Sequence, residues 1–157
     1  MKFAELTVGR RITLGPVSVD EQEVLAFANK YDQQWFHTDP AQAADGPFQG
    51  LIASGWHTCA MAMSLVASRV LKGSESYASP GLAYLRWPNP VRPGDSLTLE
   101  LTVLEQRVSD SRPWLGIVRW QWVMTRQGGA VVLDLEATSM FRLGDEKPPS
   151  PKTRADS

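Results

Sequence analysis

Both histidines of the chain lie in one short segment, together with an aspartate and a glycine-flanked helix start. Asp32 precedes His37 by five residues, and Ser54-Gly55 lies just before His57. A carboxylate, an imidazole and unpaired backbone N–H groups are the parts needed to move protons beside a carbonyl and to stabilise negative charge on its oxygen. We therefore expect proton-transfer chemistry in residues 32–57.

The spacing of Asp32 and His37 makes a geometric prediction. Five residues of separation put two side chains on neither the same helical face nor the same strand face. The two must therefore meet across a turn that follows a helix. A turn aspartate is also commonly just a capping residue, so Asp32 has a purely structural interpretation as well.

Other residues of the segment have simpler interpretations. His57 falls in the first turn of a predicted helix, where we favour a structural or pocket-lining role over proton transfer. Asp39 directly precedes Pro40, as a helix-capping residue does. A zinc site made of His37, Asp39 and His57 is disfavoured, because no metal-ligand spacing is complete.

Composition predicts one soluble domain without nucleic acid as a partner. Of the 157 residues, 43% are hydrophobic and 21% are charged, and the net charge is −1 with the basic residues scattered. The single Cys59 cannot form an internal disulfide, the start lacks a signal-peptide core, and the apolar stretch 59–71 is too short to span a membrane. We therefore expect a cytoplasmic protein that is not membrane-bound.

The first half of the chain has helical periodicity. Apolar residues recur at intervals of three or four after Asp20, which with Glu23 has the spacing of a capping pair, so a short helix should end at about 30–32. A second helical pattern begins at Trp56 and stops before Gly73. Its apolar residues occupy most of the circumference, which predicts burial on nearly every side.

The second half has the alternation of strands. Strands are expected at residues 11–14, 77–87, 97–103, 117–125 and 131–142, with a hairpin at Gln127-Gly128-Gly129. The two patterns predict an α+β fold in which a curved antiparallel sheet of about five strands wraps around one buried central helix. Because such a sheet covers only part of the helix and leaves its edges unpaired, we expect a homodimer or a larger homo-oligomer. Residues 1–143 form the predicted domain, and the polar residues 144–157 form a predicted flexible tail.

Three stretches together resemble the MaoC family of acyl dehydratases and (R)-specific enoyl-CoA hydratases, which has the hotdog fold. The similarity extends in order and spacing to about Leu143. The stretches are Asp32-Gln-Gln-Trp-Phe-His37-Thr-Asp39, Gly50-Leu-Ile-Ala-Ser-Gly-Trp-His-Thr58 and Arg86-Trp-Pro-Asn-Pro-Val-Arg-Pro-Gly-Asp95.

The resemblance implies reversible hydration of a 2-enoyl thioester, with an acyl-CoA as substrate and with no cofactor or metal. Asp32 and His37 would hold the water and transfer the protons. The family usually assigns the base role to the aspartate and the acid role to the histidine, a division that the sequence leaves open. Gly55 matches the family's oxyanion-hole glycine at the start of the central helix, where the first N–H groups have no intrahelical partner.

Departures from the family pattern leave the acyl chain, its carrier and the stereochemistry open. Gln34 and Trp35 replace an Asn-Pro pair, and the larger Trp35 ring is expected to narrow or reshape the pocket. Met63 replaces a serine of the central helix, with Ser64 one position away. Met61 and Met63 suit an acyl-chain tunnel, although core packing is the simpler interpretation.

Two functions of other classes compete with hydration. A hotdog thioesterase typically carries its acid on the central helix, but residues 56–72 contain no Asp or Glu. A non-catalytic acyl-binding subunit is the other alternative, if Trp35 and Met63 have reshaped the pocket.

Farther along, Pro93-Gly94 predicts a type II turn that Arg92 and Asp95 stabilise. Arg86 and Arg92 are also candidates for contacts with the phosphates of coenzyme A.

Overall fold

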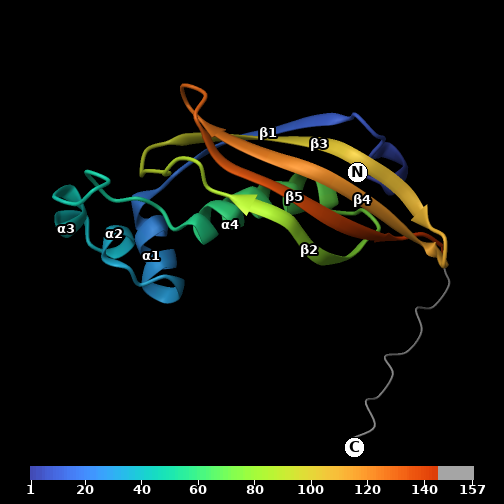
Figure 1. Ribbon diagram of the computed structural model, residues 1–157, viewed down its shortest axis with the longest axis horizontal. Coiled ribbons are helices and arrows are strands. Elements are labelled where there is room, and N and C mark those ends of the chain that lie inside the picture. The colour runs from blue at the N-terminus through green and yellow to red at the C-terminus, as the bar shows by residue number, and fades with distance from the viewer. Residues whose placement is uncertain (145–157) are drawn as a thin grey trace, which may run out of the picture.

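One antiparallel sheet curves around a helix in the computed structural model, which describes residues 1–144 (Figure 1). The spatial order of its five strands is β1-β3-β4-β5-β2, so β1 and β2 are the edges. The predicted α+β hotdog architecture is therefore confirmed, whereas the predicted tail lies outside the described residues apart from Gly144. The strands are β1 (Arg11–Ser18), β2 (Ser76–Arg86), β3 (Ser96–Ser109), β4 (Arg112–Arg126) and β5 (Val131–Arg142).

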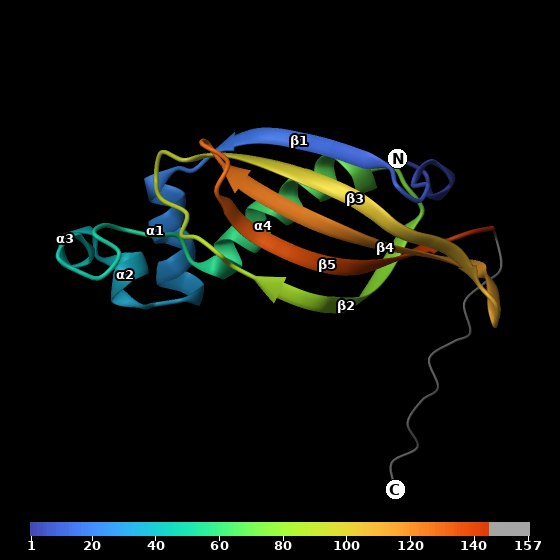
Figure 2. The ribbon, with the colours of Figure 1, turned by 45° about the horizontal axis from the view of Figure 1, so that its top comes forward.

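The helices fall into two groups, which Figure 2 separates clearly. Helix α4 (Gly55–Val66), continued by the π-helical turn η2 (Ala67–Leu71), lies along the concave side of the sheet. Three shorter helices gather at one end of the sheet: α1 (Glu21–Tyr31), α2 (Trp35–Thr38) and α3 (Pro40–Ala44). A 3₁₀ turn, η1 (Phe3–Glu5), precedes β1. In residues 1–144, no helix is both long and apolar enough to cross a membrane, and the cytoplasmic location stays a prediction.

Local sequence explains where these elements begin and end. Asp20 caps α1, although its Oδ1 atom accepts from the Gln22 N–H at 3.2 Å rather than forming the predicted pair with Glu23. Gly73, just beyond the end of η2, has a φ of +72°, the left-handed conformation that glycine adopts at helix ends. Gly128 and Gly129 also have positive φ values and form the predicted hairpin turn between β4 and β5.

Strands β3 and β4 extend beyond the predicted limits. Leu97, Leu99, Leu101 and Val103 are buried, as their alternation predicts. After Leu104 the alternation of burial stops, but the two strands stay paired as far as Ser109 and Arg112. Periodicity did not indicate this extension, because residues 104–109 of β3 include no buried side chain.

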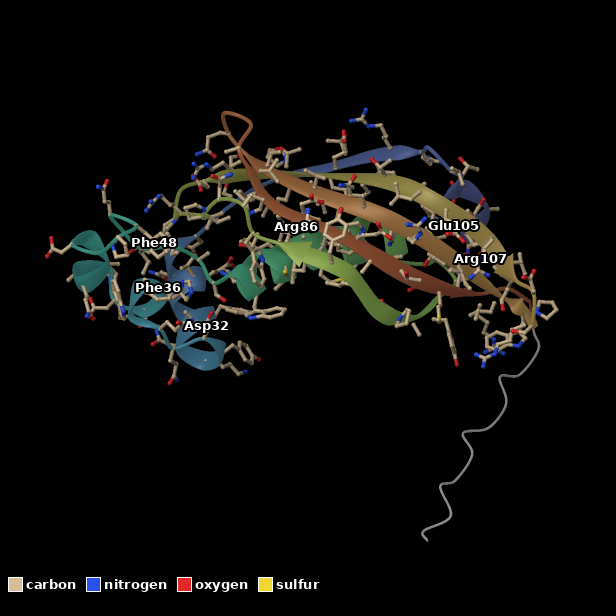
Figure 3. All side chains as sticks on the ribbon, viewed as in Figure 1. Asp32, Phe36, Phe48, Arg86, Glu105 and Arg107 are labelled. Carbon is tan, nitrogen blue, oxygen red and sulfur yellow. The ribbon has the colours of Figure 1, made fainter. Side chains whose placement is uncertain are left out.

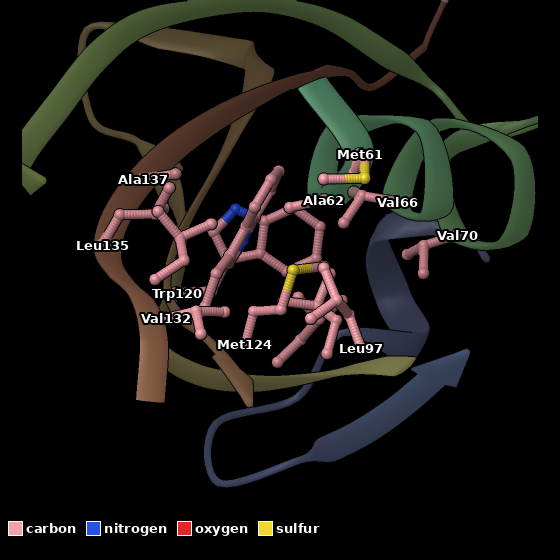
Figure 4. Packing of buried hydrophobic residues seen from close by; sticks show 14 of the residues in the cluster. Met61, Ala62, Val66, Val70, Leu97, Trp120, Met124, Val132, Leu135 and Ala137 are labelled. Atoms are coloured by element: carbon pink, nitrogen blue, oxygen red, sulfur yellow. The ribbon is translucent and has the colours of Figure 1, made fainter. Parts of the chain in front are cut away.

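The core lies between the sheet and one face of α4. Figure 4 shows Ala62 and Val66 of the helix facing Trp120 and Met124 of β4, and all four side chains are fully buried. As predicted, the sheet of one chain covers only part of this helix, and burial of its remaining side by a second copy stays a prediction. Trp56 is 60% exposed and Met63 is 42% exposed, because the sheet curves around only one side of α4.

Substitution at two alanines of α4 tests this packing. Ala62 is fully buried and Ala60 is exposed on the same helix. We expect Ala62→Leu to reduce the free energy of unfolding by about 1–3 kcal/mol, because the added methylenes overfill a packed core. The matched Ala60→Leu should change it by less than about 0.5 kcal/mol. Urea unfolding followed by circular dichroism measures both, and equal effects would contradict this packing.

Candidate active site

Asp32 and His37 meet at the helical end of the molecule. Asp32 is the residue at which α1 ends, and His37 lies in α2 after a short turn. The His37 Nε2 atom lies 3.4 Å from the Asp32 Oδ2 atom. Convergence across a turn, as the five-residue spacing predicts, is confirmed. Figure 3 shows Asp32 at this end, far from Glu105 and Arg107 on the opposite part of the sheet.

A buried hydrogen bond fixes the orientation of the His37 ring. Its Nδ1 atom lies 2.7 Å from the backbone oxygen of Ile52, and the residue is only 5% exposed. A carbonyl oxygen only accepts hydrogen bonds, so Nδ1 carries a proton. The Nε2 atom is the one that faces Asp32.

The Asp32 carboxylate is held in its ionised form by two donors. The Ser54 hydroxyl donates to Oδ2 at 2.7 Å, and the Gln34 amide donates to Oδ1 at 2.7 Å. Burial by itself raises the pKa of Asp32, but these two hydrogen bonds and the neighbouring His37 outweigh it, so the pKa lies below its ordinary value. The sequence did not indicate the Ser54 contact, because the two residues are 22 positions apart and only the packing of α1 against α4 joins them.

Gly55 is the first residue of α4, as predicted. Ser54 precedes it at the capping position, but its side chain makes no capping hydrogen bond to the helix because its hydroxyl binds Asp32. The first N–H groups of α4 are therefore left without a side-chain acceptor, at the positive end of the helix dipole. Gly55 also has a steric role: the Trp87 ring lies against it, and an added Cβ would come within 2.5 Å of that ring.

His37 and Gly55 both line one apolar pocket of about 290 Å³. In the described part of the chain, no acidic or basic side chain other than His37 lines it. Trp35 is also absent from its walls and does not narrow this pocket directly, so an effect of Trp35 on the shape of the pocket stays a prediction. The Trp35 ring turns away and packs on Gly46, where an added Cβ would lie 2.6 Å from it. Sequence reasoning missed several walls of the pocket, which come from two loops: Phe48, Ile52, Trp87, Asn89 and Val91.

The remaining candidates have structural contacts. The Asp39 carboxylate accepts from the Gln42 N–H at 3.0 Å and caps α3, as predicted. His57 is buried and stacks on Phe27 of α1 at 4.8 Å, and it lines a separate pocket. Burial lowers the pKa of His57, with a smaller opposing effect from Glu23. Within residues 1–144, no cluster of three or more His, Cys, Asp or Glu side chains is arranged to hold a metal ion.

The two arginine candidates contact protein groups. The Arg92 guanidinium donates to the backbone oxygen of Phe48, and its backbone N–H donates to Asp95 at 2.8 Å. Arg92 and Asp95 therefore stabilise the turn before β3, as predicted. Arg86 lies over the Tyr84 ring at 4.9 Å on the sheet. A contact of either arginine with coenzyme A stays a prediction.

A five-stranded sheet around one helix, with an acid–imidazole pair beside the helix start, defines a hotdog protein of the acyl-thioester hydratase and dehydratase class. The sequence model of the MaoC-like domain matches residues 4–118. The chain belongs to the MaoC-like domain family, and this membership supports hydration or dehydration of acyl thioesters as its general class of reaction.

Individual relatives agree with this assignment. The structure of the MaoC-like dehydratase from Rhodospirillum rubrum is 36% identical, with a TM-score of 0.81 over 91% of this chain and 97% of that one. The (R)-hydratase from A. caviae involved in PHA biosynthesis is 28% identical, with a TM-score of 0.69 over 88% and 97%. The 3-hydroxyacyl-thioester dehydratase Z of Mycobacterium tuberculosis is 39% identical over 80 residues, 50% of this chain and only 53% of that protein.

The Ser54 contact predicts a measurable change in the ionisation of Asp32. We expect Ser54→Ala to raise the pKa of Asp32, because the carboxylate loses a donor that stabilises its charged form. Ser54→Thr retains the hydroxyl and should leave the pKa near that of the parent protein. NMR titration of the side-chain carboxyl carbon measures each value. An unchanged pKa in the alanine variant would contradict the contact.

Proposed function

We propose that this protein catalyses the reversible hydration of a 2-enoyl thioester to a 3-hydroxyacyl thioester, with an acyl-CoA as substrate. One observation carries the proposal: the Asp32–His37 pair lies beside the first residue of α4, and His37 and Gly55 line the same apolar pocket. His37 and Gly55 thus bring an acid and a backbone donor to the pocket, and the base Asp32, which is not one of the residues that line it, lies 3.4 Å from His37.

The proposed reaction uses only proton transfers. Ionised Asp32 takes a proton from the water molecule as the water oxygen bonds to the β carbon of the substrate. Protonated His37 delivers its Nε2 proton to the α carbon, and the N–H of Gly55 stabilises the enolate oxygen that forms between these steps. The proton on Asp32 then returns to His37 across the 3.4 Å between Oδ2 and Nε2, which restores both groups.

Hydration fits the site better than either alternative. A thioesterase that uses an acid on the central helix has no counterpart here, since residues 55–71 contain neither Asp nor Glu. A non-catalytic subunit requires a pocket that separates or blocks the acid and base. In this chain the two groups lie 3.4 Å apart, and Trp35 lies outside the walls of the pocket.

Substitutions at the acid and the base test the reaction. We expect purified protein to remove the absorbance of the conjugated thioester of short 2-enoyl-CoAs. Asp32→Asn and His37→Ala should each lower kcat roughly 10²–10⁴-fold, the usual contribution of a positioned acid or base. Asp39→Asn makes the same carboxylate-to-amide change outside the pocket, at a position where the amide oxygen still caps α3, and should retain the parent kcat, which makes it the matched control.

Thiol release distinguishes hydration from thioester cleavage in the same samples. A thiol reagent should detect no free coenzyme A while the absorbance falls. Parent-like turnover by the Asp32→Asn, His37→Ala double variant would show that these roles are wrong.

The second part of the proposal is a homodimer formed along β2. Within residues 1–144, β2 has β5 as its only strand partner, and residues 76–83 are all exposed. Apolar side chains on this edge, Tyr77 and Leu82, are about half exposed, next to the exposed Trp56 and Met63 of α4. A second copy that pairs with this edge about a two-fold axis would cover the exposed apolar residues of β2 and those of α4.

A charge on the edge strand should dissociate the dimer. We expect Leu82→Asp to convert a dimer to a monomer in light scattering after size exclusion, because a buried unpaired carboxylate is costly. Leu104→Asp introduces the same charge at an exposed leucine of β3, away from this edge, and should remain dimeric. Dissociation of both variants, or of neither, would contradict the assignment of the interface to β2.

A further inference from the structure

Two tryptophans stand between the catalytic pocket and a second apolar cavity. Trp56 is the second residue of α4, and Trp87 directly follows β2. Their rings meet edge to face, with centroids 5.2 Å apart and an interplanar angle of 79°. Trp87 lines the catalytic pocket, whereas Trp56 lines the second cavity.

The second cavity, which we call the α4 groove, has a volume of about 410 Å³ and lies between α4 and the inner side of β2 and β5. Its walls are mainly apolar, and none of the described residues that line it is acidic or basic. It therefore suits a hydrocarbon tail and offers nothing to the phosphates of coenzyme A. The residues that matter here are Trp56, Cys59, Met63, Leu85 and Leu135.

The same two segments lead from the pocket into the α4 groove. On α4, Gly55 lines the pocket and the next residue, Trp56, lines the groove. At the end of β2, Leu85 lines the groove, and Trp87 lines the pocket two residues later. The Trp56–Trp87 pair therefore occupies the junction of the two cavities.

The two rings differ in how firmly they are held. Trp87 lies directly against Gly55, where an added Cβ would come within 2.5 Å of its ring. Trp56 has the Trp87 contact on one side and is 60% exposed. Trp87 is thus the more firmly packed ring of the pair, and Trp56 is the more exposed one.

We propose that Trp56 is a specificity-determining residue that keeps the acyl tail of the substrate out of the α4 groove, so that the enzyme favours short 2-enoyl thioesters. This inference rests on the proposed function. Removal of the Trp56 ring takes away one of the two rings between the pocket and the groove, and Met63 in the groove adapts to the shape of a longer tail. Trp56 affects only the binding of the acyl tail, because His37 and Gly55 lie on the pocket side of the tryptophan pair.

The test compares kcat/KM for butenoyl-CoA and dodecenoyl-CoA. The parent enzyme should have the higher kcat/KM for butenoyl-CoA. Trp56→Ala should raise the ratio of kcat/KM for dodecenoyl-CoA to kcat/KM for butenoyl-CoA about tenfold or more. Leu104→Ala, which removes an exposed apolar side chain outside both cavities, should leave the ratio unchanged. If the alanine variant does not fold, Trp56→Leu retains an apolar contact with Trp87 and replaces it in the same test.

Binding of saturated thioesters separates this inference from the proposed reaction. Butanoyl-CoA and dodecanoyl-CoA cannot be hydrated, so calorimetry measures only their binding. The Trp56 variant should bind dodecanoyl-CoA more tightly relative to butanoyl-CoA than the parent protein does. If no enoyl-CoA is hydrated but the variant binds the longer chain more tightly, the proposed reaction is wrong and the proposed role of Trp56 is supported. Two results would contradict the role of Trp56 while butenoyl-CoA is hydrated. One is an equal kcat/KM ratio of the two substrates in parent and variant, and the other is a parent enzyme that already favours dodecenoyl-CoA.

Discussion

The hydrogen bond from Ser54 to Asp32 is the constraint on which the rest of the site depends. It joins the residue that ends α1 to the residue that precedes α4. A serine at this position usually caps the helix that follows it. Here the hydroxyl donates to Asp32 and makes no capping hydrogen bond, so the contact helps to lower the pKa of Asp32 while the first N–H groups of α4 have no side-chain acceptor.

Backbone hydrogen bonds hold the other side of the site. Residues 51–54 form an extended link before α4, in which the Ile52 oxygen accepts from His37 and the Ile52 N–H donates to Phe36 at 3.1 Å. The Ala53 N–H then donates to Val91 at 2.8 Å, which connects the link to the loop before β3. The imidazole and the segment before α4 are thus held by main-chain groups, whereas the acid is held by the side chains of Ser54 and Gln34.

Incomplete burial connects the fold to both proposals about its surface. The sheet covers one side of α4, so apolar residues on the other side and along β2 remain exposed in the single chain. A second copy on β2 would cover this surface and close the α4 groove from outside. The groove would then become a tunnel whose entrance is set by Trp56, so that assembly and chain-length selection would depend on the same surface.

The sequence by itself determined the elements and the catalytic candidates, because alternation in β3, periodicity in α4 and the Asp32–His37 spacing are local patterns. The position of the Trp35 ring could not be read from the sequence, since it depends on which way a side chain turns in three dimensions. Tertiary structure alone decided that Ser54 reaches Asp32, that Ile52 orients His37 and that Trp87 covers Gly55. These contacts join residues that are distant in the sequence, and only the packing of α1, α4 and the sheet brings their atoms within reach.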